Sequence, residues 1–525
     1  MAGYAVQPLI AKVVVGIPRC SLAIGARTGS WTRRGWQRPQ LSAWLRASAL
    51  GLTATAAVSL WRRCSSTRPA AHRHLGRRAV ASATIRGGSA LPRVVAKAGV
   101  AGRPLPEQPL PLPLCARDGL VEGAPPEDVF TWDTVTKRMP KILQSVLDSL
   151  PATLADEASL LEGVRSLQQE MKEGAQLQLL ESDSPWVSAK SWNQDLASFL
   201  EKGQGWHEAP WWVVENYMYK RLLQELARCG AEAARYDPFQ PQKQKALAAS
   251  VGALEASLQP LMDVVAAAEA TPGGHEDRRR ALEAALVRSL WGNQADLSLS
   301  AGKVESANGG APGRMISDNT DVALDILQQA AGRPVVIVLD NHGLEVLCDL
   351  VLADAILRLA SPSSVSLHVK DAPVFVSDVT EGDIPGILEW LDEHEASLAG
   401  RLRARMADGR LRVVPNSFYT TARTFWELPA DLSTKYSEAA VVILKGDANY
   451  RRLLGDLHWP YDTDFGAFVQ SFWPSAGLVA LRTMKSGVAL GITQEKQADA
   501  RAAHPDDWLT CGVYGQVLAS SSFSV

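Results

Sequence analysis

The stretch at residues 335–343, VVIVLDNHG, decides the fold class of this chain. Five consecutive apolar residues without alternation are typical of a strand that is covered on both faces, as in a parallel sheet. The polar residues that follow place a turn at the carboxyl end of this strand, and a helical pattern comes next. Since strand followed by helix is the repeating unit of α/β folds, the stretch predicts an α/β domain.

The same pattern recurs along the rest of the chain. We expect further strands at residues 365–369 (VSLHV), 373–376, 440–444 (AVVIL) and 478–481, each followed by polar residues. Alternating strands and helices predict a three-layer, Rossmann-like α/β/α domain over residues 334–525. In such a domain the ligand crevice lies at the carboxyl ends of the strands.

The residues before this domain have a different composition. Apolar residues recur every three or four positions from residue 128 onward, as at Met139, Ile142 and Val146, which predicts an all-helical subdomain over residues 128–300. A Gly-rich and Ala-rich stretch at 306–314 indicates a flexible connection with a helix over 301–333. Prolines at alternating positions predict a stiff linker at 104–127.

Residues 1–103 have the composition of a targeting leader. Residues 1–106 contain 17 Lys and Arg but no Asp or Glu, which is typical of a transit peptide that is disordered and directs a protein to a plastid or mitochondrion. If the leader is not used, the protein would be cytoplasmic, and a basic tail that binds anionic surfaces is the competing interpretation. The uncharged run at 47–61 is only 15 residues long, so we expect no stable membrane span.

The charge of the remaining chain excludes one class of partner. Residues 107–525 carry 37 basic against 56 acidic residues, a formal charge of −19, and we therefore expect no nucleic-acid partner. The six cysteines lie far apart, without a CxxC pair or a histidine at metal-ligand spacing, so neither a zinc site nor a disulfide framework is indicated. The sequence does not indicate the oligomeric state.

Polar and charged residues that could take part in catalysis follow the predicted strands. The crevice rule therefore predicts that carboxylates, an amide and cations meet at one edge of the sheet. After successive strands these residues are Asp340, Asn341 and Glu345; Asp378; Lys445, Asp447, Asn449, Tyr450 and Arg451; and Arg482 and Lys485.

The oxygen donors Asp340, Asn341 and Asp378 suit a hard divalent cation such as Mg²⁺ or Mn²⁺. Lysine and arginine groups nearby could neutralise a phosphate whose other oxygens bind the metal. A metal and these cationic groups together provide what phosphoryl transfer to water requires. Taken alone, Asp340 to Gly343 would more often be a strand-to-helix turn, and Asn293 and Asp296 could line the crevice or cap a helix.

A family resemblance rests on these residues. Four blocks resemble the signatures of the damage-control metal-dependent phosphatases, and the last is similar to the sugar-phosphate (acidic residue methyltransferase-like) subfamily. They are Asp340-Asn341-x-Gly343-x-Glu345, Ser377-Asp378-Val379, Lys445-Gly-Asp447-x-Asn449-Tyr450-Arg451 and Arg482-Thr-x-Lys485. Two upstream blocks also resemble that subfamily, Pro210-Trp211-x-x-x-Glu215-x-Tyr217-x-Tyr219 and Trp291-Gly-Asn293-x-Ala-Asp296.

The resemblance implies a catalytic site and a substrate class. It implies a metal held by Asp340, Asn341 and Asp378, with Lys485 also catalytic. It also implies hydrolysis of phosphorylated sugars such as fructose 1-phosphate, with Mn²⁺, Ni²⁺ or Co²⁺ supporting activity. The implied substrate contacts are Glu345, Asp447, Asn449, Tyr450, Arg451 and Lys485. From their positions we also expect substrate contacts from Lys445, Arg482, Asn293 and Asp296. His342 stands where the family pattern leads us to expect a small residue.

Three alternatives remain open from the sequence. The subfamily name is associated with an S-adenosylmethionine-dependent protein-glutamate O-methyltransferase, but the one GxG, Gly203-Gln204-Gly205, follows no predicted strand. A sugar-phosphate binding protein without catalysis is the second alternative. A haloacid dehalogenase-type phosphatase is the third, although its nucleophilic Asp is followed two residues later by an acid, and position 342 is His.

Overall fold

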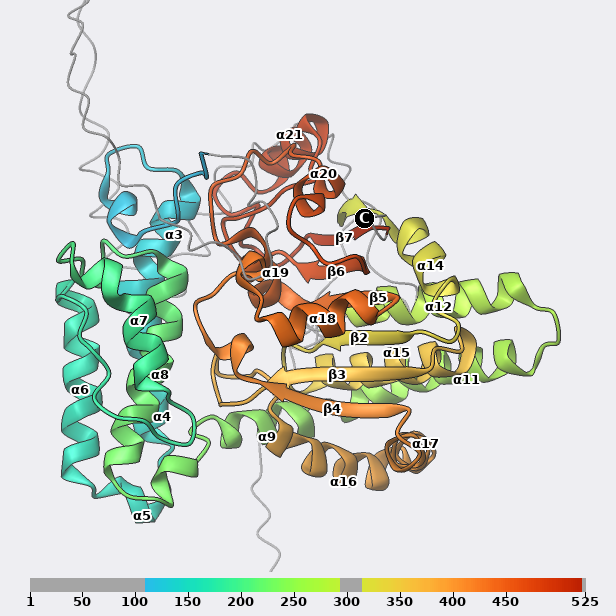
Figure 1. Cartoon of the computed structure of the whole chain (residues 1–525), viewed down its shortest axis with the longest axis horizontal. Helices are drawn as coiled ribbons and strands as arrows, with labels where there is room; N and C mark the ends of the chain where they lie inside the picture. Colours follow the sequence, from blue (N-terminus) through green and yellow to red (C-terminus); the bar gives the residue numbers. More distant parts are fainter. Residues whose placement is uncertain (1–108, 293–313, 522–525) are drawn as a thin grey trace, which may run out of the picture. The chain divides into compact units, whose positions relative to one another are not determined.

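The computed structural model describes residues 109–292 and 314–521 (Figure 1). The predicted leader therefore lies outside the described residues, as do Asn293, Asp296 and residues 301–313 of the predicted flexible connection. Within the described residues a seven-stranded sheet is flanked by helices, which confirms the predicted α/β class.

The sheet has the order β1-β7-β6-β5-β2-β3-β4. Neighbouring strands among β6, β5, β2, β3 and β4 are parallel, whereas β7 is antiparallel to β6 and parallel to β1. The apolar runs at 335–339, 365–369, 440–444 and 478–481 thus lie in parallel strands as predicted, and β7 makes the complete sheet mixed. Its strands are β1 (Met315–Asp318), β2 (Pro334–Val338), β3 (Ser364–Lys370), β4 (Leu411–Asn416), β5 (Val441–Lys445), β6 (Gly477–Thr483) and β7 (Gly515–Ser520).

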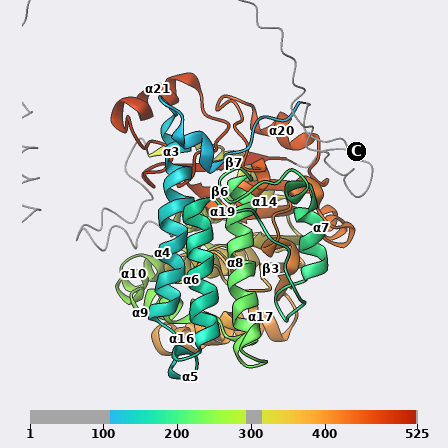
Figure 2. The ribbon, with the colours of Figure 1, turned by 90° about the vertical axis from the view of Figure 1, so that its left-hand side faces the viewer.

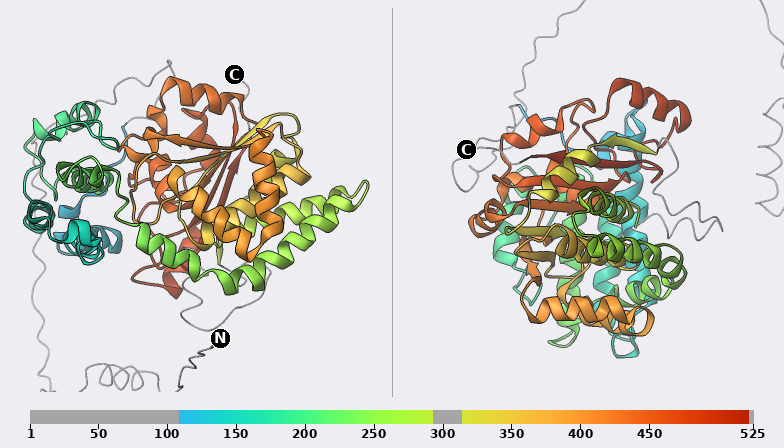
Figure 3. Two further views of the ribbon diagram at one scale, coloured as in Figure 1. Left: turned by 90° about the horizontal axis from the view of Figure 1, so that it is seen from below. Right: turned by 90° about the vertical axis from the view of Figure 1, so that its right-hand side faces the viewer.

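Alternate residues of the central strands β2, β5 and β6 enter two separate cores, as the period of two in a strand requires. In β2, Val336 and Val338 belong to one hydrophobic cluster, and Val335 and Ile337 belong to the other. Both faces of the sheet are thus covered, and this explains why the strand at 335–339 lacks polar residues (Figure 3).

The first core joins the sheet to the N-terminal helices. Helices α4, α6 and α8 lie side by side (Figure 2). The N-terminal elements are η1 (Ala116–Leu120), α3 (Pro126–Asp133), η2 (Thr134–Arg138), α4 (Met139–Asp148), α5 (Ala152–Ala155), α6 (Ala158–Glu173), α7 (Ala189–Leu200) and α8 (Trp211–Arg228). Elements after β4 also contribute to this core, among them η6 (Ser417–Thr420), η7 (Phe425–Glu427) and α18 (Ala430–Glu438).

The second core covers the opposite face of the sheet. Its helices before β1 are α9 (Gln240–Ala248), α10 (Val251–Ala253), η4 (Leu254–Leu258), α11 (Gln259–Ala270) and α12 (His275–Leu290), which follow η3 (Ala233–Arg235). Those within the α/β part are α14 (Thr320–Gln328), α15 (Leu344–Leu359), α16 (Ile384–His394) and α17 (Ala396–Ala407), with η5 (Glu381–Asp383) before α16. Helices from the region predicted as one helical subdomain therefore contact both faces of the sheet, and the domain boundaries themselves stay predictions.

The remaining helices lie near the carboxyl ends of β5 and β6 in the sequence. They are α19 (Gly446–Leu454), α20 (Phe465–Gln470) and α21 (Gln494–Ala503). Among the described residues one helical run, Val251–Ala270, has the length and mean hydropathy (1.2) of a membrane span. Leu254, Leu258 and Val265 of this run are buried in the second core, which is typical of a core helix.

Candidate active site

Asp340 and Asn341 follow β2 and meet Asp378 from the loop after β3. Asn341 and Asp378 form an isolated antiparallel bridge, and the Val379 amide donates to the Asp340 carbonyl at 2.8 Å. The Asn341 amide nitrogen Nδ2 donates to Asp340 Oδ2 at 3.0 Å and to Glu345 Oε2 at 2.9 Å. The three predicted metal ligands are therefore brought together by backbone contacts at one edge of the sheet.

The loop that delivers Asp378 is strained. Phe375 and Val376 both have positive φ, at 54° and 68°, a conformation that is costly for bulky and β-branched residues. Residues 373–376 are thus a turn, and their prediction as a strand was wrong, because their apolar side chains pack on helix α8 without joining the sheet. Phe375 lies 5.7 Å from Trp212 and 5.3 Å from Tyr219, measured between ring centroids. The turn directs Ser377 to Asn341, and Ser377 Oγ donates to Asn341 Oδ1 at 2.6 Å.

Lys370, which the sequence analysis did not single out, joins the two aspartates. Its ammonium lies 2.8 Å from Asp378 Oδ2 and 3.4 Å from Asp340 Oδ1, and it donates to the Leu339 carbonyl at 2.9 Å. All of these groups are buried. Lys370 is the last residue of β3, so the crevice rule applied to that strand would have found it.

A second buried group of charges adjoins the first. Lys445, the last residue of β5, donates to the Ser289 carbonyl at 2.7 Å and lies 3.3 Å from Asp349 Oδ1 and 3.7 Å from Glu345 Oε1. Glu345 also accepts from Asn341, so it connects the two groups. Lys445 is therefore engaged by protein groups in this structure, and its predicted contact with substrate stays a prediction.

The two buried groups carry excess negative charge. They contain four carboxylates (Asp340, Glu345, Asp349 and Asp378) but only two ammonium groups (Lys370 and Lys445), which leaves two excess negative charges when all are ionised. Burial, with the neighbouring carboxylates, raises the pKa of Asp340 well above its usual value and raises that of Asp378. Burial also raises the pKa of Asp349 to about 7. A bound divalent cation would compensate this charge, so the residues present fit a metal.

Helix α19 begins directly against Asp340. Gly446 has φ 78°, and a Cβ at this position would lie 1.8 Å from Asp340 Oδ2. Only glycine therefore lets the first turn of α19 approach the carboxylate. Asn449 anchors this turn, since its Nδ2 donates to the carbonyls of Leu339 at 3.1 Å and Lys445 at 2.8 Å.

Asp447 and Arg482 form a pair that connects α19 to β6. Arg482 Nε donates to Asp447 Oδ1 at 2.6 Å, and Arg482 lies 4.2 Å from the centre of the Tyr450 ring. Burial opposes ionisation of Asp447, but the charges of Arg482 and Arg451 and the hydrogen bonds from Arg482 and Ser486 together outweigh it and hold the pKa of this carboxyl below its usual value. The Lys485 amide donates to the same carboxylate at 3.3 Å, whereas the half-buried Lys485 ammonium has no ion pair within the described residues.

Arg451 is held by protein groups on every side. It donates from Nε and a terminal nitrogen to the two oxygens of Asp456, and from its other terminal nitrogen to Glu215. Its guanidinium lies 3.6 Å from the centre of the Trp211 ring. These contacts connect α19 to helix α8, and the predicted contact of Arg451 with substrate stays a prediction.

His342 and the GxG stretch bear on the alternatives. The His342 ring is buried beside Lys243 and Asp383, and burial lowers its pKa to about 4, so it is neutral at pH 7. Gly203 to Gly205 lies in the turn between α7 and α8, after a helix. This stretch therefore lacks the strand that a glycine-rich nucleotide turn requires.

The comparisons with known proteins agree with this geometry. The model of the damage-control phosphatase ARMT1-like domain matches residues 134–501. The mouse protein "Damage-control phosphatase ARMT1" is 30% identical over 430 residues, which cover 75% of this chain and 96% of the relative. The rat protein of that name is 31% identical over 432 residues (74% and 95%), and the human one is 27% identical over 423 residues (74% and 95%).

One solved structure was also similar. It is a DUF89 family protein from Pyrococcus horikoshii, with 14% sequence identity and a TM-score of 0.34, and the match covers 67% of this chain and 91% of that chain. The family model spans well over half of this chain, and the curated relatives match almost over their full length. This chain belongs to the damage-control phosphatase ARMT1-like family.

Proposed function

We propose that this protein is a metal-dependent phosphomonoester hydrolase that acts on small phosphorylated sugars such as fructose 1-phosphate. The observation that carries the proposal is the cluster of the buried carboxylates Asp340, Glu345 and Asp378 with half-buried Asn341. This cluster has excess negative charge and lies at the strand ends of a damage-control phosphatase chain. Oxygen donors alone favour Mn²⁺ or Mg²⁺, and the resemblance adds Co²⁺ and Ni²⁺.

The metal would be held by Asp340 and Asp378, with Asn341 as the neutral ligand. A divalent ion bound there would polarise the phosphoryl group and lower the pKa of the attacking water. Lys370 fixes the two carboxylates relative to each other, because its ammonium contacts both. Ser377 and Glu345 fix the Asn341 amide from either side.

The substrate phosphate would lie beside the first turns of α15 and α19. Backbone N–H groups in the first turn of a helix have no partner within the helix and bind anions. Both helices begin at the edge of the sheet that carries Asp340, at Leu344 and Gly446. Lys485 is available to add positive charge, since Asp447 holds its backbone while its ammonium has no ion pair in the described part of the chain.

The test is a screen of the full-length protein against phosphorylated metabolites with Mn²⁺, Co²⁺, Ni²⁺ or Mg²⁺. We expect phosphate release that requires a divalent ion and is abolished by Asp340→Asn and by Asp378→Asn. Asp354→Asn is the matched control, because Asp354 is equally buried but pairs with Arg358 and Arg401 away from the cluster. Activity that persists in both cluster variants would refute the site.

Assays on the same purified protein distinguish the hydrolase from the methyltransferase and from the binding protein without catalysis. Methyl transfer from S-adenosylmethionine in metal-chelated protein, without phosphate release, would support the methyltransferase. Binding of sugar phosphates without turnover under any metal would support the binding protein. Phosphate release that stops with chelation and returns with metal supports the hydrolase.

A further inference from the structure

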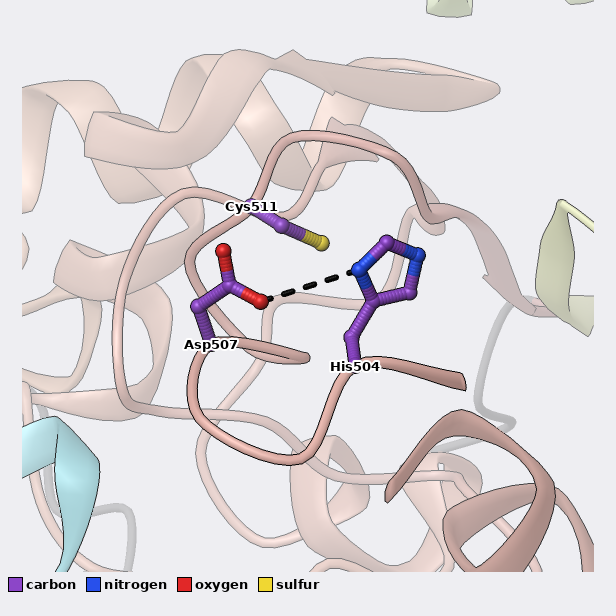
Figure 4. Close-up of side chains that lie close together, drawn as sticks. All are labelled: His504, Asp507 and Cys511. Atoms are coloured by element: carbon purple, nitrogen blue, oxygen red, sulfur yellow. Dashed lines mark ion pairs between the residues drawn. The ribbon is translucent and has the colours of Figure 1, made fainter. Parts of the chain in front are cut away.

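A second group of metal-ligating side chains lies outside the active site. His504, Asp507 and Cys511 follow helix α21 and point toward one another (Figure 4). Their ligand atoms all lie within 4.8 Å of one another, and His504 Nδ1 is 3.6 Å from Asp507 Oδ1. The sequence analysis expected no such group, because the spacing of these three residues matches no common zinc motif.

The backbone turns after α21 build this group. The Cys511 amide donates to the Asp507 carbonyl at 2.7 Å, and the Trp508 amide donates to the His504 carbonyl at 3.1 Å. The ring of Tyr514 meets the imidazole of His504 edge-on, at 5.6 Å between centroids. His504 and Cys511 are half-buried and Asp507 is exposed, so the site is held from the protein side and open to water on the other.

The donor set selects a class of ion. Thiolate and imidazole together favour Zn²⁺, Co²⁺ or Ni²⁺ over Mg²⁺, and three protein ligands leave a fourth tetrahedral position for water. With bonds of roughly 2.0–2.3 Å, the donors of a tetrahedral ion are about 3.3–3.8 Å apart. The donors here lie within 4.8 Å of one another, so they need to close by about 1.5 Å at most, and side-chain rotation on the exposed side can supply this.

The group is connected to the segment that carries Lys485. Met484 donates its amide hydrogen to the Tyr514 carbonyl at 2.9 Å, and its own carbonyl accepts from the Gly512 amide at 3.1 Å. Met484 and Trp508 also belong to one small hydrophobic cluster. An ion bound by all three side chains would therefore stiffen this turn. The segment from Arg482 to Lys485 packs against the same turn through Met484.

We propose that His504, Asp507 and Cys511 form a second divalent-metal site, for Zn²⁺ or the chemically similar Co²⁺, that clips the end of α21 to the approach to β7. The ion binds with loss of the thiol proton to solvent and without a change of oxidation state. This proposal does not rest on the proposed function, since it concerns different residues and a different donor chemistry.

Cobalt distinguishes the two sites directly. A Co²⁺–thiolate bond gives a charge-transfer absorption in the near ultraviolet, whereas the oxygen donors of the cluster around Asp340 cannot. We expect titration of the reduced, metal-free, full-length protein with Co²⁺ to produce this absorption at one ion per chain. Cys511→Ser and His504→Ala should abolish or strongly weaken it, and Asp378→Asn should leave it unchanged.

Cys229→Ser is the matched control, because Cys229 is also a half-buried free thiol. It follows helix α8 directly and is far from the three ligands in the sequence. This variant should retain the full absorption. Absence of the absorption in the wild type, or its survival in Cys511→Ser, would overturn the proposal and leave a hydrogen-bonded turn without an ion.

A second measurement covers the event that a variant folds poorly. Hydrogen exchange at the amides of Met484, Gly512 and Tyr514 should slow on addition of one equivalent of Zn²⁺ in the wild type and in Cys229→Ser. It should not change in His504→Asn, which keeps a polar side chain at the same place. Equal protection in His504→Asn would show that Zn²⁺ acts elsewhere, and the clip would be refuted.

Discussion

Replacing Gly446 with alanine tests the geometry of the site with a single methyl group. An added Cβ would lie 1.8 Å from Asp340 Oδ2, whereas real Cβ contacts essentially never fall below 3.0 Å, so the carboxylate must move by roughly 1.2 Å. Misplacement of a reacting group by about 1 Å costs roughly 100-fold in rate, or about 2.7 kcal/mol in the activation free energy. The positive φ of Gly446 adds about 1–2 kcal/mol to the cost for the folded state.

Gly409→Ala separates the two effects. Gly409 has nearly the same φ, 77° against 78°, but the nearest atom to its Cβ is 4.0 Å away, in the flexible Arg412 side chain. Urea unfolding should show a loss of about 1–2 kcal/mol from the backbone strain in both variants. Phosphate release should fall about 100-fold or more only in Gly446→Ala, together with weaker Mn²⁺ binding. Turnover in Gly446→Ala within threefold of that in Gly409→Ala would refute the close approach of α19 to Asp340.

Three further predictions concern buried charges. Lys370→Met should destabilise the metal-free protein by about 3–5 kcal/mol in urea unfolding, because Asp340 and Asp378 lose their shared partner. Excess Mn²⁺ should restore part of this stability. A variant as stable as the wild type would contradict the pairing. Arg451→Lys should cost about 2–4 kcal/mol in the same assay while it keeps the charge, since the two-pronged contact and the ring contact are both lost; an unchanged midpoint would count against this role. Burial lowers the pKa of His368 from 6.5 to about 4, so the unfolded chain binds the proton more tightly than the folded one. The free energy of unfolding should therefore fall by about 3 kcal/mol from this group as the pH drops from 7 to 4. The His368→Phe variant should lack this part of the pH dependence, and an equal pH dependence in both proteins would refute the prediction.

The strand ends of β2, β5 and β6 were predictable because long apolar runs mark buried strands, and the polar residues after them then fall at one edge. Strands β1, β4 and β7 were not, because their sequences MISD, LRVVPN and GQVLAS have few consecutive apolar residues. Their pairing depends on tertiary contacts that no local pattern contains. The direction of β7 also follows from the return of the chain after α21 and not from its own residues.

At the site, the strand ends predicted the oxygen donors and the buried cations Lys445, Arg451 and Arg482 but not Lys370. Lysine is rarely fully buried, so residue type alone gave no reason to select Lys370, although its position at the end of β3 did. The apolar run at residues 373–376 resembled a strand because its side chains pack on or within the first core, yet Phe375 and Val376 have left-handed backbone conformations, and Phe375 packs against aromatic rings. The partners of Arg451 lie on another helix or beyond its own helix, so its full enclosure could not be predicted from spacing.

The position of β7 has a consequence for biosynthesis. This strand lies between β1 and β6, and β1 pairs with no other strand in the sheet. Strand β7 is the last of the described strands to be synthesised and yet occupies an interior place, so β1 precedes its described neighbour by about two hundred residues. Until β7 has been made, the nascent chain exposes the edge of β6, which is a template for wrong association. The sheet therefore closes only after β7 emerges, not when any of the other described strands does.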